Sequence, residues 1–239
     1  MTPARVVSLV PSATETLVAL GLRPVGCTRF CDLAGVPSVG GTKNVDVDAV
    51  AALAPDLVIV NDEENRLEDA DALVARGLAL HSMSPRAVAD VGPAVCALAA
   101  SVGLIAPEPF DAWHEWQART RKPAHLSAFI PIWRRPWMSL AADTYGSSLL
   151  AHVGIANVFG DSADRYPEVS LGEVAARTPD VALLPSEPYA FAERHARELS
   201  AAVPGLRATF VDGRDLFWWG IRTPLAAERL HRAHCQSAE

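Results

Sequence analysis

The 239-residue sequence is short of cysteine and of positive charge. Its four cysteines are too few for a disulfide framework in a chain of this length. Two of them, Cys27 and Cys31, form a single close pair, whereas a zinc site needs further ligands. Acidic residues outnumber basic ones by 28 to 21 and no basic cluster stands out, which argues against nucleic acid or anionic membrane surfaces as partners.

Long apolar runs are also missing. The longest uncharged stretch, between Asp90 and Glu108, contains Pro93 and Gly103 and is too short and too mildly apolar for a membrane span. The apolar run at 6–10 is too short for the core of a signal peptide, and we expect a strand there. The sequence as it stands therefore predicts a cytoplasmic protein without membrane insertion. A periplasmic or cell-surface location would require an export segment ahead of it.

The motifs of the common enzyme classes are absent as well. The sequence has no G-x-G-x-x-G, no Walker loop, no H-E-x-x-H and no G-x-S-x-G. His231 and His234 share a helix face and precede Cys235, and near a C-terminus we expect a solvated face there rather than a metal site. We therefore expect no catalytic residues, no bound metal and no cofactor.

What the sequence does contain is an alternation of strand and helix. Turn and capping signals predict helices at 12–20, 46–53, 69–76, 85–102, 110–121, 145–153, 171–177, 190–202 and 223–234. Apolar runs predict strands at 6–10, 57–60, 78–81, 126–132, 181–184 and 208–211. In the first helix Ser12 is expected to be the cap, with Glu15 three residues on. This order predicts an α/β fold with parallel sheets.

Two lobes are expected. The helices at 85–102 and 110–121 follow each other with no strand between them, so we divide the chain into an α/β lobe at 1–84, a helical linker at 85–121 and a second α/β lobe at 122–239. Residues 50–60 also match residues 174–184, an offset of 124 (174 − 50), in a pattern of helix, Pro-Asp turn and strand. The match favours a duplicated lobe, although this short pattern also arises by chance.

The candidate ligand contacts follow the predicted strands. Ligands of open parallel sheets bind beyond the carboxyl ends of the strands, which selects the loops at 11–14, 61–65, 81–84, 133–138, 185–191 and 212–220. Four of the six tryptophans lie in these loops, namely Trp133, Trp137, Trp218 and Trp219. Indole rings suit large, flat or partly apolar ligands; the alternative is that they cap the ends of the two cores.

The polar residues of these loops allow two interpretations. The run 61–65 is either a solvated loop in which Asn61 or Asp62 caps the next helix, or a contact for a ligand or partner. Arg134, Arg135 and Arg222 could bind anionic groups of a ligand in forked hydrogen bonds, or form surface salt bridges.

Several stretches resemble the class III substrate-binding proteins of ABC importers, the helical-backbone metal receptors. They lie at 7–15, 25–26, 39–40, 53–59, 154–159, 166–170 and 179–180, and in this order they cover nearly the whole chain. The resemblance implies two Rossmann-like lobes joined by a bridging helix, with a ligand cleft between them. It further implies a binding protein, not an enzyme, whose ligand is a small metal complex of the cobalamin, siderophore or haem class.

The resemblance also guides the choice of site residues. Phe30 falls where cobalamin binders of the family have a cleft aromatic, while Thr42 and Asn61 fall where those proteins have tryptophans. The ligand-binding set expected from the loops and the resemblance is Phe30, Asn61, Trp133, Arg134, Trp137, Tyr189, Phe217, Trp218 and Arg222. An ABC permease is implied as a partner; its docking glutamate does not align cleanly in the first lobe, where Leu67 stands with Glu68 beside it.

Two alternatives to an importer receptor remain. The first is a cytoplasmic chelatase-like enzyme on the same fold, with His81 and Glu63 handling the metal. A second cleft histidine or acid facing His81 would favour it. The other is a cytoplasmic ligand sensor or carrier without a permease.

Overall fold

The computed structural model describes residues 4–235, except for the side chains of His234 and Cys235. Contacts divide the chain into two compact units. Unit 1 comprises the residues up to 85, residues 89–113 and residues 219–221, and unit 2 comprises residues 86–88, residues 114–218 and the residues from 222 onward. The predicted linker at 85–121 is therefore shared between the units. No helix in the described part of the chain is both long and apolar enough to cross a bilayer.

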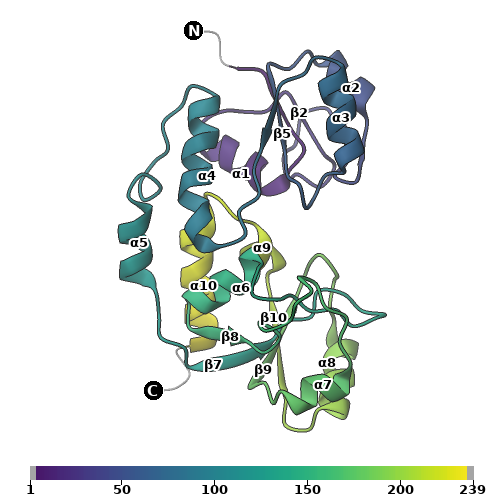
Figure 1. Cartoon of the computed structure of the whole chain (residues 1–239), viewed down its shortest axis with the longest axis vertical. Helices are drawn as coiled ribbons and strands as arrows, with labels where there is room; N and C mark the ends of the chain where they lie inside the picture. Colours follow the sequence, from purple (N-terminus) through teal and green to yellow (C-terminus); the bar gives the residue numbers. More distant parts are fainter. Residues whose placement is uncertain (1–3, 236–239) are drawn as a thin grey trace. The chain divides into compact units, whose positions relative to one another are not determined.

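Unit 1 is built on a four-stranded parallel sheet in the order β2-β1-β5-β6. Its strands are β1 (Val6–Ser8), β2 (Gly26–Cys27), β5 (Leu57–Val60) and β6 (Leu80–Ser82), with a small antiparallel hairpin of β3 (Gly40–Gly41) and β4 (Asn44–Val45). Its helices are α1 (Pro11–Ala19), α2 (Val47–Ala52), α3 (Leu67–Ala75) and most of α4 (Val88–Ser101). Figure 1 shows α2 and α3 on one side of the strands and α1 and α4 on the other.

Unit 2 repeats this plan with the strand order β10-β9-β7-β8, again all parallel. Its strands are β7 (Leu126–Phe129), β8 (Ile155–Asn157), β9 (Val181–Pro185) and β10 (Arg207–Val211). Its helices are α5 (Trp113–Thr120), α6 (Tyr145–His152), α7 (Leu171–Ala176), α8 (Glu193–Ala202), α9 (Gly213–Phe217) and α10 (Thr223–Cys235). Side chains of α7 and α8 pack on the strands around Phe129 to form one continuous core. Two separate parallel sheets confirm the predicted fold class.

The internal match extends to the backbone. Helix α2 and helix α7 are offset by 124 residues (171 − 47), and both end in a turn with one residue in the left-handed region. These residues are Ala54, with φ of 44°, and Thr178, with φ of 46°. A left-handed conformation is uncommon for a residue with a Cβ, so its recurrence at the matched position supports a duplicated unit rather than a chance similarity.

The aspartates of the two Pro-Asp turns make the same contact. The Asp56 carboxylate accepts a hydrogen bond of 2.8 Å from the backbone N–H of Arg5, just before β1. The Asp180 carboxylate accepts one of 2.7 Å from the backbone N–H of Ser127 in β7, and a second from the Ser127 hydroxyl. Each aspartate therefore ties the start of its own strand to the neighbouring strand.

These contacts predict a pH dependence for unit 2. The hydrogen bonds from Ser127 hold the pKa of Asp180 below its usual value. A carboxyl with a lowered folded-state pKa contributes stability above its unfolded pKa of about 4, and that contribution is lost as the pH falls through the folded-state pKa. We expect Asp180→Asn to lower stability at pH 7 and to flatten the loss of stability below about pH 4. Urea unfolding at several pH values checks this; parallel curves for the parent and the variant would contradict it.

The structure corrects two details of the predicted elements. Helix α1 begins at Pro11 rather than after a Ser12 cap: its N-cap residue is Val10, without a side-chain cap, and the buried Ser12 hydroxyl has no hydrogen-bond partner among the described atoms. Proline suits the first helical position because its φ is preset and it has no N–H to satisfy. Within the predicted loop at 212–220, residues 213–217 form the short helix α9, capped by the Asp212 carboxylate.

Candidate functional site

The carboxyl ends of the unit 2 strands carry most of the predicted site. Strands β7, β9 and β10 lie next to one another and are parallel, so the segments after Phe129, Pro185 and Val211 leave from the same edge of the sheet. These segments are 130–138, 186–191 and 212–218. We call this edge, with its three segments, the carboxyl edge of unit 2; in sheets of this kind it is where ligands bind.

A pair of aromatic side chains, one exposed and one partly buried, lies on this edge. Trp133 is 45% exposed and its ring centroid lies 5.4 Å from that of Tyr189, in an edge-to-face arrangement. The backbone of Trp133 pairs with Met138, which makes residues 133–138 a tight hairpin. The Tyr189 hydroxyl lies 3.3 Å from Nε2 of His195. Because His195 is buried, this contact fixes the position of the tyrosine ring. The pair therefore presents the Trp133 ring and part of the Tyr189 ring to solvent.

Two arginines follow Trp133 and differ in their environment. The Arg134 guanidinium pairs with Glu198 and lies 4.8 Å from the Trp137 ring, and this hydrogen bonding lowers the pKa of Glu198. The salt-bridge alternative therefore describes Arg134. Arg135 is exposed, has φ of 74° at the tip of the hairpin, and forms no ion pair with another described residue. Arg135 is thus the cation of this pair that is available to an anionic group.

Trp137 is buried, unlike Trp133. The sequence predicts that it faces a ligand, but its side chain is only 6% exposed and belongs to the unit 2 core. Its ring stacks on Phe191 at 5.8 Å and meets Phe129 edge-on. The hairpin places Trp133 outside and turns Trp137 inward, so Trp137 supports the edge without offering surface to a ligand.

A second cluster surrounds Trp218. Its indole N–H donates a hydrogen bond of 2.6 Å to Glu187, and the guanidinium groups of Arg214 and Arg222 lie 4.9 Å and 5.2 Å from its ring. Burial raises the pKa of the Glu187 carboxyl, and the hydrogen bond from Trp218 partly offsets this effect. The sequence indicates Glu187 only as the position matching Glu63, 124 residues earlier, and this match is the one available signal.

Arg222 is largely buried and is paired within the protein. Its side chain is 14% exposed and donates a hydrogen bond of 2.8 Å to Asp215, whose side chain is 8% exposed and also binds Arg229. The buried Asp215 carboxylate therefore links Arg222, in the segment after α9, to Arg229 in α10. The Arg222 guanidinium is bound to Asp215 and lies over the Trp218 ring, which it helps to orient.

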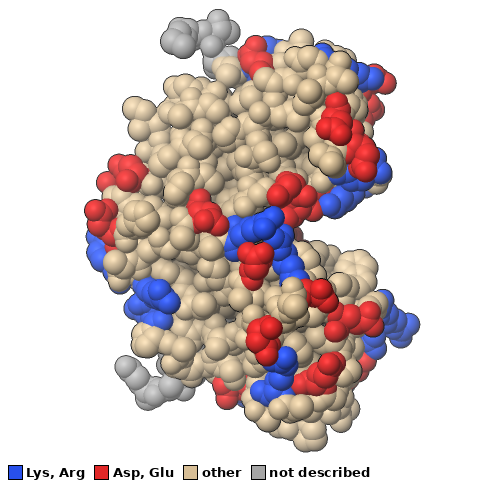
Figure 2. All heavy atoms as spheres, in the orientation of Figure 1, with Lys and Arg blue, Asp and Glu red and all other residues tan. Residues whose placement is uncertain are grey.

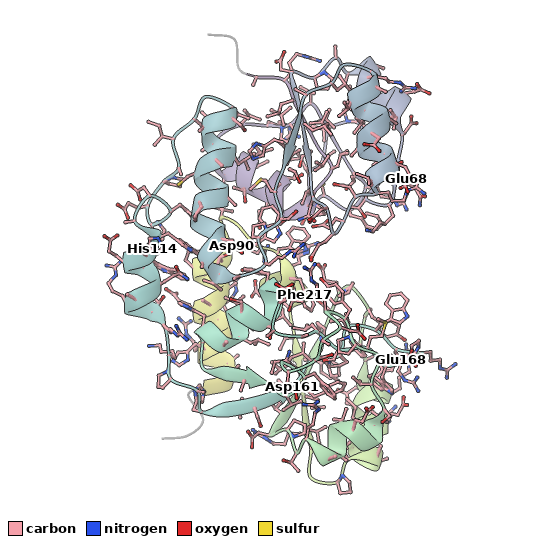
Figure 3. All side chains as sticks on the ribbon, viewed as in Figure 1. Glu68, Asp90, His114, Asp161, Glu168 and Phe217 are labelled. Carbon is pink, nitrogen blue, oxygen red and sulfur yellow. The ribbon has the colours of Figure 1, made fainter. Side chains whose placement is uncertain are left out.

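Phe217 ends helix α9 and is half-buried (Figure 3). It packs closely over Gly146 in α6, where an added Cβ would lie 3.2 Å from the phenyl ring. Only part of the ring is therefore available to a ligand, and it contributes an apolar margin beside Trp218.

The close fit of α9 predicts a large effect of one methyl group. A Cβ at Gly213 would lie 2.6 Å from the backbone nitrogen and oxygen of Glu187, so we expect Gly213→Ala to destabilise the protein by about 2 kcal/mol or more. The matched control is Gly172→Ala in α7, where the nearest atom would be 3.8 Å away. There the helix should gain about 0.5–1 kcal/mol. Equal effects of the two substitutions in urea unfolding would contradict the proposed packing.

The remaining two predicted residues belong to unit 1. Phe30 follows β2, is 52% exposed and has the Arg29 guanidinium 4.8 Å from its ring. Arg29 was not predicted, and only its position beside Phe30 could have indicated it. Asn61 is 3% exposed, and its side-chain oxygen accepts hydrogen bonds from the backbone N–H groups of Glu63 and Glu64. It therefore shapes the 61–65 loop, but it does not cap the next helix, α3, whose N-cap residue is Arg66 without a side-chain cap.

The residues named for a chelatase form no metal centre in the described part of the chain. His81 lies half-buried in β6, and burial lowers its pKa. No group of three or more histidine, cysteine, aspartate or glutamate side chains that could hold a metal ion occurs among the described residues.

The chain is similar in sequence and in fold to proteins named for binding vitamin B12 or heme. No family profile matches the chain. A vitamin B12-binding protein of Vibrio parahaemolyticus is 25% identical over 92% of this chain and 84% of that protein. Among solved structures, the periplasmic vitamin B12 binding protein BtuF of Vibrio cholerae has a TM-score of 0.77 with 21% identity, over 96% of both chains. A periplasmic heme binding protein from Pseudomonas aeruginosa has a TM-score of 0.77 with 22% identity, over 99% of this chain and 94% of the other.

The structural likeness extends over nearly the whole length of these proteins and shows a shared fold. The sequence match to the Vibrio parahaemolyticus protein covers almost the same span. Both agree with the motifs at 7–15, 53–59 and 179–180 that carry the resemblance. The chain therefore shares the fold of these periplasmic vitamin B12-binding and heme-binding proteins.

Proposed function

We propose that this protein binds a metal complex of the cobalamin or haem class at the carboxyl edge of unit 2. The observation that supports the proposal is the aromatic pair of the exposed Trp133 and the partly buried Tyr189, which lies where ligands of parallel sheets bind. Indole and phenol rings offer a large apolar area at low entropic cost, which suits the flat face of a tetrapyrrole.

The charges around the pair fit the margin of such a ligand. Arg135 extends from the same hairpin and can bind carboxylate groups, while Trp218 and its partner Glu187 provide an apolar face and a hydrogen-bond acceptor. In unit 1, Phe30 and Arg29 repeat the combination of an exposed ring and a cation after β2. The predicted cleft between lobes stays a prediction.

We also propose that the bound ligand is delivered to an ABC permease, the partner that the family implies. Both solved relatives are described as periplasmic proteins. A receptor role would require this chain, like those proteins, to act outside the cytoplasm. A carrier without a permease would bind the same ligand, so ligand binding alone does not separate the two roles. They are separated by a pull-down from native membranes in the presence of ligand: a receptor retains a permease, and a carrier does not.

Binding is tested by absorbance titration of the purified protein with cyanocobalamin and with haemin. We expect a 1:1 complex with at least one of them, with a Kd of about 1 μM or tighter. Serum albumin serves to measure non-specific adsorption of haemin. If neither compound binds more tightly than about 100 μM, the proposed ligand class is wrong.

A further inference from the structure

Unit 2 has a second concave site, which lies at the end of its sheet opposite the carboxyl edge. A cavity of about 220 Å³ lies between helices α5 and α10. Lys122 and Val153, which line it, come just before β7 and β8, so the cavity lies toward the amino ends of those strands. The aromatic carboxyl edge is at the opposite ends. The cavity is therefore a separate site, and binding there does not depend on the proposed function.

The rim of this cavity is strongly basic. Arg119, Lys122 and Arg232 line it and are exposed, and none of them forms a salt bridge with another described residue. Glu228 is the one acidic residue of the lining. Figure 2 shows blue atoms at the lower end of α5, where this rim begins. In a protein of net charge −7, such a concentration of unpaired positive charge is a local exception.

Part of the cavity lining is apolar. Trp116 is 7% exposed and stacks on His152 with a centroid distance of 5.0 Å. His152 in turn bonds to the Thr120 hydroxyl at 2.9 Å, and burial lowers its pKa to about 4, so it is neutral at pH 7. Trp116, Val153 and Ala227 thus form an apolar wall in a lining that also contains the three cations.

A nitrogen atom in the wall lacks a partner. Nδ1 of His231 is buried and makes no hydrogen bond to any described atom, while the ring meets His125 edge-on at 6.3 Å. Cations near the C-terminal ends of α5 and α10 are favoured by the helix dipoles, which accounts for part of the positive charge. It does not account for the unsatisfied nitrogen, because buried polar atoms are nearly always hydrogen-bonded.

We propose that this cavity binds a small oxyanion, a phosphate or carboxylate group carried on a compact apolar body. Arg119, Lys122 and Arg232 would neutralise the anionic group, and His231 would complete its hydrogen bonds. The volume exceeds that of a phosphate group alone, so the apolar wall would contact the rest of the molecule. The site therefore takes a small organic anion, which is unlike a tetrapyrrole in size.

Nuclear magnetic resonance of the full chain tests the proposal, with inorganic phosphate, phenyl phosphate and benzoate as probes. We expect saturable shifts of amide signals in α5 and α10, with phenyl phosphate binding more tightly than inorganic phosphate because its ring contacts the apolar wall. Comparison of phenyl phosphate with benzoate shows whether phosphate or carboxylate is preferred. Shifts that stay linear for all three probes up to ~10 mM would overturn the proposal.

Charge-matched variants separate this site from general attraction. The double variant Arg119→Gln/Lys122→Gln should weaken phenyl phosphate binding at least about tenfold. The control Arg197→Gln/Arg207→Gln removes two exposed charges elsewhere in unit 2 and should leave it unchanged. His231→Phe replaces the imidazole with another aromatic ring and removes both ring nitrogens, and should weaken binding about fivefold. Equal affinities of the Arg119/Lys122 variant and its control would overturn the proposal.

Discussion

Trp133→Ala is expected to weaken binding of the metal complex at least about 30-fold, which corresponds to about 2 kcal/mol. The indole is 45% exposed and its main neighbour is Tyr189, so its removal takes away ligand contact rather than core packing. Stability should therefore change little. Absorbance titration measures the affinity, and urea unfolding measures the stability of the same preparation.

The matched control for this variant is Phe210→Ala in β10. Phe210 is 44% exposed, almost as much as Trp133, and lies outside the three segments of the carboxyl edge. It should leave ligand affinity unchanged. A Trp133 variant that binds as tightly as the Phe210 variant would show that the ligand does not contact this edge.

The second large effect concerns stability. Asp215→Asn is expected to destabilise the protein by about 3 kcal/mol, since it leaves two arginines without their shared buried carboxylate. Arg222, with a 14% exposed side chain, would carry most of this cost. Trp218 packs against Arg222, so ligand affinity should fall as well.

Asp161→Asn is the control for Asp215→Asn. Asp161 also pairs with an arginine, Arg177, at 2.7 Å, but its side chain is 69% exposed. Exposed pairs contribute little because water and salt screen them. Urea unfolding should show a much smaller change for this variant. Similar losses for the two variants would mean that burial of the Asp215 cluster is not what makes it important.

Periodicity and turn chemistry were enough to predict the fold. The strand at 57–60 matches β5, and the elements of both units fall in the predicted order because apolar runs, Pro-Asp turns and glycines are local signals. Short elements were missed. Strand β2 has two residues and α9 has five, too few for a periodic pattern to emerge.

The site was only partly predictable, because burial depends on distant contacts. Trp133 and Trp137 look alike in the sequence, yet the pairing of Trp133 with Met138 leaves one exposed and buries the other. In the same way Arg222 looks like a free cation until Asp215, seven residues earlier, is brought against it by α9. A sequence shows which residue types are near the edge of a sheet, but not which of them are already paired.

The indole N–H signals of the tryptophans report whether the ligand lies on the carboxyl edge of unit 2. The protein is labelled with ¹⁵N and titrated with cyanocobalamin or with gallium protoporphyrin, a diamagnetic substitute for haem. Assignment of the indole signals uses single Trp→Phe variants. We predict that the signals of Trp133 and Trp218 shift on binding, whereas those of the buried Trp113 and Trp116 stay in place. Binding that leaves Trp133 and Trp218 unmoved, or the absence of binding by either compound, would contradict a ligand site on this edge.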